Sequence, residues 1–244
     1  MDNVPNLLLA VIKSYGRISW SHIFDLIDKQ CKVLSRKAFL ESATQTKVDS
    51  MDPKNYKQQL LNQLYAPYQK CMECPLATQG RTHIVFGEGD SDADLMFIGE
   101  GPGKDEDLQG RPFVGRSGQL LTRLLSLVGL ERKQVFISNI VKCRPPNNRK
   151  PTPLESATCK NLLLINQIKI IRPKVICTLG SAAIQGLLEK DVKITQIRGK
   201  ALSFDGITLV PTYHPAYVLR NPKELGTLLK DITLAFESTL THQK

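Results

Sequence analysis

The residues best suited to chemistry lie between positions 97 and 119. An apolar run over 93–98 leads into Gly99-Glu100-Gly101-Pro102-Gly103, and a second glycine-rich turn at 115–118 opens a predicted helix. Glycine lets the backbone approach a ligand closely, and the N–H groups at a helix start suit an anion such as phosphate. The spacing matches neither the GxGxxG of dinucleotide-binding folds nor the GxxxxGK(S/T) of P-loops. We therefore expect a ligand pocket of another kind at the end of a strand.

Carboxylates in this segment offer acid–base chemistry. Glu100 and Glu106 each have a carboxylate that can orient a water molecule or stabilise a nearby positive charge. Asp105 and Asp107 are expected to form a solvated acidic turn. One aromatic side chain, Phe113, follows Arg-Pro in the polar loop between the two turns. A ring in such a loop either anchors the core or stacks on a flat ligand.

Further polar residues follow the other strand-like runs. Asn139 ends the run 134–139, Ser181 follows 174–179, and His214 follows 208–212. Ligands of parallel sheets bind at the carboxyl ends of the strands. We therefore expect these side chains to converge on one rim of the sheet, together with the glycine-rich turn.

The cysteines indicate a second site. Cys71 and Cys74 form a C-x2-C pair, Cys143 follows the second strand-like run, and Cys159 lies in the next predicted helix. Four gathered thiolates can hold zinc or an iron–sulfur cluster. The spacing alone leaves open a redox-active C-x2-C pair plus two buried thiols. Cys177 lies inside an apolar run and is expected to be a small core residue.

Strands and helices alternate along the chain. This alternation predicts an α/β fold: a three-layer sandwich with a central, mostly parallel four-stranded sheet flanked by helices, plus a small helical N-terminal extension. Short apolar runs predict strands over 93–98, 134–139, 174–179 and 208–212. Helical periodicity covers 54–68, 118–128, 153–171 and 181–188.

The first part of the chain is organised differently from the rest. Residues 1–53 form a predicted helical extension and linker, with short helices over 7–15 and 22–33. Residues 54–244 form the main predicted domain. We expect the only tryptophan, Trp20, to pack this small appendage, and we expect activity to survive its removal.

The balance of charge favours a polyanionic partner. The 244-residue chain has a formal net charge of +10, which suits nucleic acid or simply aids solubility. No apolar run is long enough to span a membrane, and the first residues lack the basic region of a secretory signal. Six irregularly spaced cysteines do not form a secreted disulfide framework. We expect a cytoplasmic protein without membrane contact.

Taken together, these residues resemble the family 4 uracil-DNA glycosylases, the iron–sulfur class of that superfamily. The resemblance covers roughly residues 56–236 in matching order, and it leaves residues 1–50 outside. The matching segments are Cys71–Cys74, Gly99–Gly103, Gly110–Gly115, Ser138–Pro146 and His214–Ala216.

The resemblance implies a DNA repair glycosylase. Such an enzyme flips uracil out of DNA, hydrolyses its N-glycosidic bond and leaves an abasic site. The resemblance also implies one structural 4Fe–4S cluster on Cys71, Cys74, Cys143 and Cys159. The expected partner is uracil-containing DNA, single- or double-stranded, and the expected protein is a monomer in a prokaryotic cytoplasm, associated with the nucleoid. A replication clamp or repair partner is left open.

By resemblance, four residues would bind uracil: Gly101, Phe113, Asn139 and His214. The Asn139 carboxamide presents an acceptor beside donors, which complement uracil N3–H and O4 and mismatch cytosine. Phe113 would stack on the flipped base, and the Gly101 backbone would touch it. His214 would donate a hydrogen bond to O2 and stabilise the departing anion.

The catalytic residues implied are Glu106, His214 and Glu100. In family 1 enzymes an aspartate occupies the position of Gly101, so here the attacking water must be held differently. We expect Glu106 to position this water, with Glu100 as an orienting group beside it.

Helix starts and cations are expected to hold the DNA. The loop 214–220 would enter the duplex, with Leu219 or a neighbour as the wedge and Arg220 on a phosphate. Backbone phosphates would meet the helix starts at Gly115, Ser117, Gly118 and Ser181.

Three alternatives compete with turnover of uracil-DNA. A covalently trapping branch of the superfamily uses a histidine in a basic insertion after the second strand, and 143–151 contains none. A non-catalytic nucleic-acid-binding module predicts basic residues without the carboxylate–Asn–His set. A zinc-bound protein would be colourless, because zinc is d¹⁰.

Overall fold

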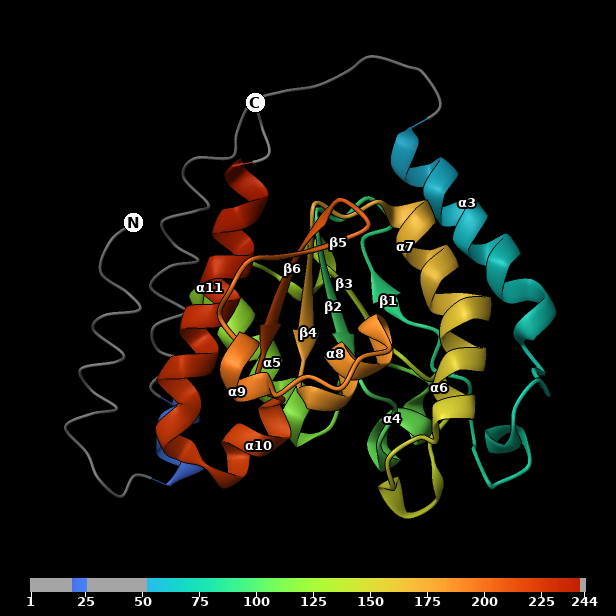
Figure 1. The fold of residues 1–244 in the computed structure, drawn as a ribbon, viewed down its shortest axis with the longest axis horizontal. Helices are drawn as coiled ribbons and strands as arrows, with labels where there is room; N and C mark the ends of the chain where they lie inside the picture. Colours follow the sequence, from blue (N-terminus) through green and yellow to red (C-terminus); the bar gives the residue numbers. More distant parts are fainter. Residues whose placement is uncertain (1–18, 26–51, 242–244) are drawn as a thin grey trace.

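A six-stranded sheet lies between two layers of helices (Figure 1). The computed structural model describes residues 19–25 and 52–241. The predicted helix over 7–15 lies outside the described residues, as does most of the predicted linker. Of the predicted helix over 22–33, the described part is helical over 20–25.

The four predicted strands are confirmed, but the expected strand number was wrong. The central strands β3 (Phe136–Asn139), β2 (Leu95–Gly99), β4 (Val175–Leu179) and β6 (Ile207–Thr212) are parallel neighbours in this order. Two further strands, β1 (Glu88–Gly89) and β5 (Leu202–Phe204), pair antiparallel at the two edges. They are two and three residues long and partly solvated, so no apolar run marks them.

The central strands read as continuous apolar runs because both of their faces are covered. Every residue of β2, β3 and β4 is buried, as expected for parallel strands between helices. Their registers are aligned at the carboxyl ends: Gly99 lies opposite Asn139, and Leu179 lies opposite Thr212. The polar residues that end these strands therefore meet at one edge of the sheet.

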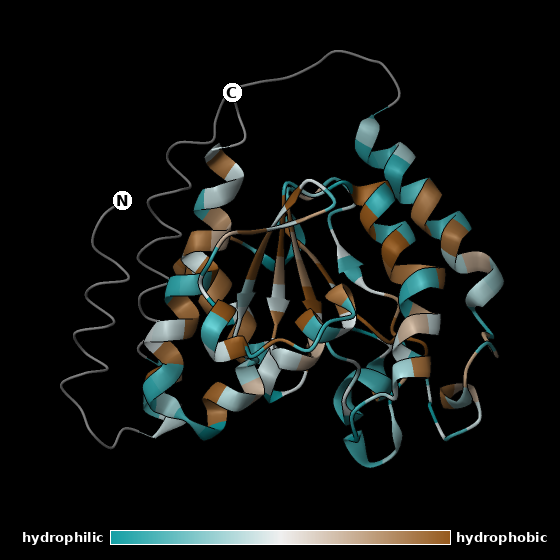
Figure 2. Ribbon diagram, viewed as in Figure 1, coloured by the Kyte–Doolittle hydropathy of each residue, from teal (hydrophilic) through white to brown (hydrophobic). Residues whose placement is uncertain are grey.

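Each face of the sheet packs against its own set of helices. One core cluster joins the sheet to α5 (Arg116–Leu127), α10 (Pro215–Arg220) and α11 (Leu225–Thr241). The other joins it to α3 (Pro53–Tyr65), α6 (Pro153–Cys159), α7 (Ile165–Ile171) and α8 (Ser181–Leu188). In Figure 2 much of the hydrophobic colour lies on the central strands, and the helices on both sides alternate hydrophobic and hydrophilic residues.

Shorter elements complete the described fold. The helices α4 (Lys104–Gln109) and α9 (Ile194–Ile197) lie in the connections after β2 and α8. The predicted helix over 153–171 is interrupted by a π-helical segment, Lys160–Leu164, between α6 and α7. Five 3₁₀ segments are Ala66–Tyr68, Pro75–Ala77, Arg132–Gln134, Pro146–Asn148 and Pro222–Glu224.

The short helix 20–25 packs onto the main domain. Ile23 is 6% exposed and joins the core cluster beneath α5 and α11. Trp20 also packs against this cluster, and its Nε1 donates a hydrogen bond to the Leu219 carbonyl at 2.9 Å. Trp20 therefore contacts α10 of the main domain as well as its own segment. In the described ranges, no helix has the length and apolar character needed to cross a membrane.

Candidate functional site

A pocket of about 560 Å³ opens at the carboxyl ends of the parallel strands. The amide, phenyl and imidazole groups that the sequence singles out share this cavity. Of the predicted site residues it is lined by Glu100, Gly101, Glu106, Phe113, Gly115, Ser117, Asn139, His214 and Arg220. Gly118, Ser181 and Leu219 are not part of its lining.

Asn139 brings an unpaired acceptor to this pocket. It is 1% exposed, and within residues 19–25 and 52–241 no group donates a hydrogen bond to its Oδ1. Burying an acceptor without a partner costs about 1–3 kcal/mol. The cost is removed when a ligand donates to Oδ1, so the orphaned atom marks a place for a donor N–H.

Gly99 allows Asn139 and Phe113 to meet. A Cβ at position 99 would lie 2.4 Å from Asn139 Oδ1 and 2.6 Å from Phe113 Cζ. Any side chain there would push the amide and the ring apart. The glycine of the first turn is therefore required by the two site residues on either side of it, a reason that the sequence pattern alone does not provide.

Phe113 is held in an unusual backbone conformation. Its φ is 51°, in the left-handed region, and its side chain is 6% exposed. The Arg132 guanidinium donates to the Phe113 carbonyl at 3.0 Å and also to the Pro112 carbonyl. A Cβ at Gly118 would lie 1.8 Å from the Phe113 oxygen. No local sequence signal marks Arg132, which lies nineteen residues from Phe113 and is brought to the loop by the fold.

His214 is neutral and presents a defined tautomer. It is the N-cap of α10, and its Nδ1 accepts a hydrogen bond from the Ala216 N–H at 3.0 Å. Desolvation, and then the charge of Arg220, lower its pKa from 6.5 to about 4. With Nδ1 accepting, the proton of the neutral ring is on Nε2. The ring lies 5.7 Å from the Phe113 ring, centroid to centroid.

Glu106 ties the two glycine-rich turns together. Its Oε1 accepts from the N–H groups of Val114 and Gly115, both at 2.9 Å, and its Oε2 accepts from the Gly103 N–H at 3.1 Å. A carboxylate has about four acceptor positions. Three are occupied by backbone groups, which leaves one for a water molecule in the pocket.

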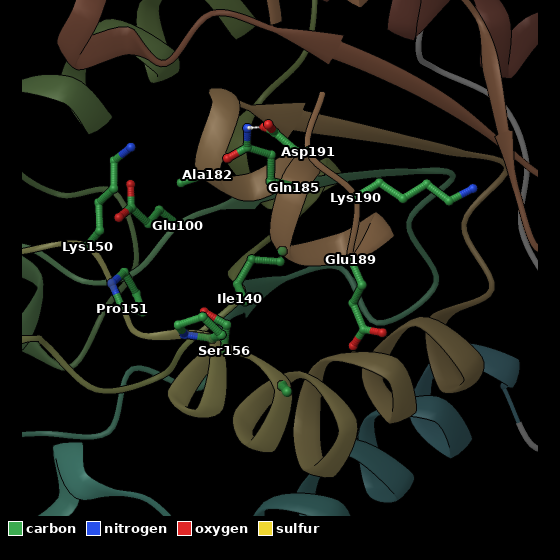
Figure 3. Close-up of a pocket in the computed structure, with 13 residues that line it drawn as sticks. Glu100, Ile140, Lys150, Pro151, Ser156, Ala182, Gln185, Glu189, Lys190 and Asp191 are labelled. Carbon is green, nitrogen blue, oxygen red and sulfur yellow. Dashed lines mark hydrogen bonds between the residues drawn. The ribbon is translucent and has the colours of Figure 1, made fainter. Parts of the chain in front are cut away.

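Glu100 lies between this pocket and a neighbouring one. The second pocket, of about 510 Å³, is lined by α6, α8 and the loop around Lys150 (Figure 3). Burial raises the pKa of the Glu100 carboxyl, and the Lys150 ammonium opposes this shift. Glu100 therefore lines both cavities, and its pKa is set by two opposing effects, burial and the Lys150 ammonium.

Not all of the predicted phosphate contacts lie at the pocket: Gly118 is buried against the Phe113 carbonyl, and Ser181 lies outside the lining. Gly115 is the N-cap of α5, but its N–H already donates to Glu106. Ser117 and Arg220 line the pocket, whereas Leu219 is half-buried against the core. Its neighbour Tyr217 is 37% exposed and lines the pocket.

One expectation about the acidic turn was wrong. Asp107 is 1% exposed, and its Oδ1 accepts from the N–H groups of Thr82 and His83 at 2.8 and 3.2 Å. It anchors the chain before β1 to α4. Asp105 is exposed, as expected.

Four cysteines lie near one another on the α6 side of the sheet. Burial raises the pKa of Cys143, Arg81 opposes this shift, and Cys74 and Cys71 add to it. Burial raises the pKa of Cys159 to about 12, against the influence of Lys142. In the described part of the chain, no three His, Cys, Asp or Glu side chains are placed to hold a single metal ion.

Two of these sulfurs have hydrogen-bond donors that would offset the effect of burial on a thiolate ligand. The Arg81 guanidinium donates to Cys143 Sγ at 3.3 Å, and the Lys142 backbone N–H donates to Cys159 Sγ at 3.2 Å. Cationic and N–H donors to sulfur stabilise thiolates and tune iron–sulfur clusters. The donor set therefore fits an iron–sulfur cluster.

Lys142 links the cysteines to the pocket, although no sequence signal marks it as a functional residue. This lysine is fully buried, and its Nζ donates to the Asn139 carbonyl at 2.9 Å, to Gln167 Oε1 at 2.7 Å and to Ser138 Oγ. Desolvation lowers its pKa to about 7, while Cys159 and Cys143 oppose this shift. The network fixes the backbone at Asn139.

Comparison with known proteins places the chain in a family. Residues 86–236 match the family model of the uracil DNA glycosylase superfamily. A type-4 uracil-DNA glycosylase of Thermotoga maritima is 48% identical over 167 residues, which cover 68% of this chain and 86% of the relative. One of Sulfurisphaera tokodaii is 44% identical over 183 residues, which cover 71% of this chain and 82% of the relative. One of Archaeoglobus fulgidus is 40% identical over 171 residues, which cover 67% of this chain and 85% of the relative. The chain belongs to the uracil DNA glycosylase superfamily and, within it, to the type-4 uracil-DNA glycosylases.

Proposed function

We propose that this protein repairs DNA by removing uracil. It flips the uracil nucleotide out of the helix, hydrolyses the bond between uracil N1 and the sugar C1′, and leaves an abasic site. The observation that carries this proposal is the unpaired Oδ1 of buried Asn139, in one pocket with Phe113 and His214. A pyrimidine with an N–H beside a carbonyl oxygen is the ligand that this set complements.

Asn139 reads the base. Its Oδ1 accepts from uracil N3–H, and its amide N–H donates to O4. Cytosine has an acceptor at N3 and a donor at C4, so it leaves both amide groups unpaired. A site built to hydrogen-bond its substrate rejects an unmatched analogue by ~10⁴-fold or more. Phe113 stacks on the base, and the Gly101 backbone lies along it.

His214 stabilises the leaving group. When the N1–C1′ bond breaks, its electron pair goes to uracil, and negative charge spreads over N1 and O2. The Nε2–H of neutral His214 donates a hydrogen bond to O2. A fixed donor aimed at developing charge lowers the barrier without reorganisation.

Glu106 positions the attacking water, and Glu100 supports the cationic sugar. The water adds to C1′ of the oxocarbenium-like sugar and gives its proton to solvent through the carboxylate. The free acceptor position of Glu106 lies in the pocket, beside the two turns that it holds. Glu100 adds negative charge at the same wall.

The DNA backbone is held by the rim. Its contacts are the helix starts at Ser117 and Ser181, the loop at Gly115, and the cation of Arg220. Helix α10 enters the duplex with Leu219, or with its exposed neighbour Tyr217, as the wedge.

An iron–sulfur cluster on Cys71, Cys74, Cys143 and Cys159 ties the chain before β1 to the loop after β3 and to α6. When bound, it supplies a structural cross-link, and no chemical step depends on it. The thiolates of these four residues are its ligands, and Arg81 and Lys142 donate to two of them.

The direct test uses oligonucleotides with one uracil, in single- and double-stranded form. Incubation followed by hot alkali should cleave the strand at the uracil, and cytosine in the same position should leave it intact. Product beyond one equivalent of protein distinguishes turnover from covalent trapping. Intact uracil strands, with a folded and cluster-loaded protein, would contradict the proposal.

A further inference from the structure

The described N-terminal segment contacts the helix that carries His214. Trp20 Nε1 donates to the Leu219 carbonyl at 2.9 Å, across 199 positions in sequence. In Figure 1 this segment, drawn in blue, lies beside α10 and the start of α11. The family match begins at residue 86, so the contact comes from a part of the chain outside the matched region.

Helix α10 depends on contacts at both of its ends. It has six residues, and an isolated helix of this length is not stable in water. His214 caps its first turn by accepting from the Ala216 N–H. The last carbonyls of a helix have no partner within it, and the carbonyl of Leu219 is one of them. Trp20 supplies the missing donor.

The tryptophan is itself held firmly. Its ring lies 5.7 Å from the Phe24 ring, and the Arg123 guanidinium lies 4.2 Å from the centre of Phe24. Ile23, which lies between Trp20 and Phe24 in the sequence, is part of the core. The indole therefore approaches Leu219 from a fixed support that is anchored on α5 and the core.

We propose that Trp20 is a positioning residue that orders α10 for insertion into duplex DNA. This inference rests on the proposed function, because it concerns the helix that meets the DNA there. Opening a duplex requires a wedge held in place while the base leaves. A single strand needs no wedge. The contact therefore matters more for double-stranded than for single-stranded substrate.

The test compares three variants of the full-length protein. Trp20→Phe keeps an aromatic ring and removes the N–H donor, and Trp20→Ala removes both. His22→Ala is the matched control, because His22 is exposed on the same helix and bonds only to Ser19 among the described contacts. Single-turnover rates and apparent Kd values are measured on duplex and single-stranded uracil oligonucleotides.

The expected result is a change in the ratio of the single-turnover rates on duplex and single-stranded substrate. Losing one neutral hydrogen bond changes an equilibrium by about two- to tenfold. Trp20→Phe should lower the duplex rate, relative to the single-strand rate, by about that factor, and Trp20→Ala by more. His22→Ala should keep the wild-type ratio. General destabilisation would lower both rates together and leave the ratio unchanged, which would overturn the proposal.

Amide hydrogen exchange separates this inference from the proposed function. Without DNA, Trp20→Phe should raise the exchange rates of the amides at 217–221 by about two- to tenfold, and His22→Ala should not. Unchanged exchange would show that Trp20 does not order α10, whatever the enzyme's activity. If the wild type released no uracil, the proposed function would fail, and the exchange experiment would still decide the contact.

Discussion

At the scale of single residues, the site is a set of groups held in one protonation or bonding state. Asn139 keeps an acceptor unpaired inside the fold, and His214 keeps its ring neutral beside Phe113. The unpaired acceptor costs stability in the free protein, whereas the neutral ring costs none above its ordinary pKa of 6.5. Two predictions test these states directly.

Replacing Asn139 by Asp should weaken the preference for uracil over cytosine. The carboxylate loses the donor to uracil O4 and can accept from the cytosine amino group. We expect the ratio of excision rates to fall by at least about tenfold, measured in single turnover on matched oligonucleotides. Asn62→Asp is the control, because Asn62 is exposed on α3, and it should keep the wild-type ratio. An unchanged preference in Asn139→Asp would remove the amide from base recognition.

The pH profile should lack the usual histidine step. Because desolvation and Arg220 lower the pKa of His214 to about 4, the ring stays neutral across pH 6.5. The single-turnover rate should therefore show no histidine step near pH 6.5. It should fall only as the pH approaches 4, because a proton on Nδ1 removes the acceptor of the Ala216 N–H that orients the ring. Stability from this group is present above pH 6.5 and is lost between 6.5 and 4, because the unfolded chain takes up the proton first. An activity step at pH 6.5 that is absent from His214→Gln would refute the neutral imidazole.

At the scale of elements, the pocket depends on how two glycine-rich turns are joined. The Glu106 carboxylate accepts three backbone N–H groups, one from the start of α4 and two from the loop before α5. Phe113 lies in that loop, so the same contacts set the position of its ring. Arg132, from the 3₁₀ segment before β3, holds the loop from the other side.

Removing the Glu106 side chain should therefore affect stability as well as rate. Glu106→Ala leaves three N–H groups without their acceptor, and we expect the free energy of unfolding to fall by about 2–4 kcal/mol. Urea denaturation measures this change. Asp105→Asn, exposed on the same helix, should stay near the wild-type value. A loss of activity in Glu106→Ala with undiminished stability would assign the residue to the water alone.

At the scale of the whole molecule, one rigid connection joins the cysteines to the base-reading edge. Lys142 bonds to the Asn139 carbonyl through its side chain and to Cys159 through its backbone. Cys143 follows directly, and Arg81 holds its sulfur. A cluster at these thiols would fix the loop after β3 and, through it, the end of that strand.

Losing one cysteine should therefore impair the enzyme through its structure. Cys159→Ser should lose the visible sulfur-to-iron charge-transfer absorption and most of its bound iron, and its thermal midpoint should fall. Cys177→Ser is the control, because Cys177 is buried in β4 within the other core cluster. Its absorption and iron content should match the wild type. Full iron content in Cys159→Ser would exclude this residue as a ligand.

Much of this protein could be predicted from its sequence. The apolar runs locate the four parallel strands because buried strands carry a continuous local signal. The polar residues at the strand ends predict a shared pocket, and the structure brings Asn139, Phe113 and His214 to it. The family follows from the same motifs, since their order and spacing are specific.

Contacts between distant residues were decided only by the tertiary structure. The edge strands are too short for a periodic signal, and the burial of Asp107 depends on N–H groups twenty-five and twenty-four positions away. The bond from Trp20 to Leu219 crosses 199 positions. Local sequence sets which backbone conformations and apolar faces are available. Which donor meets which acceptor is settled only when the packed core brings separate segments together.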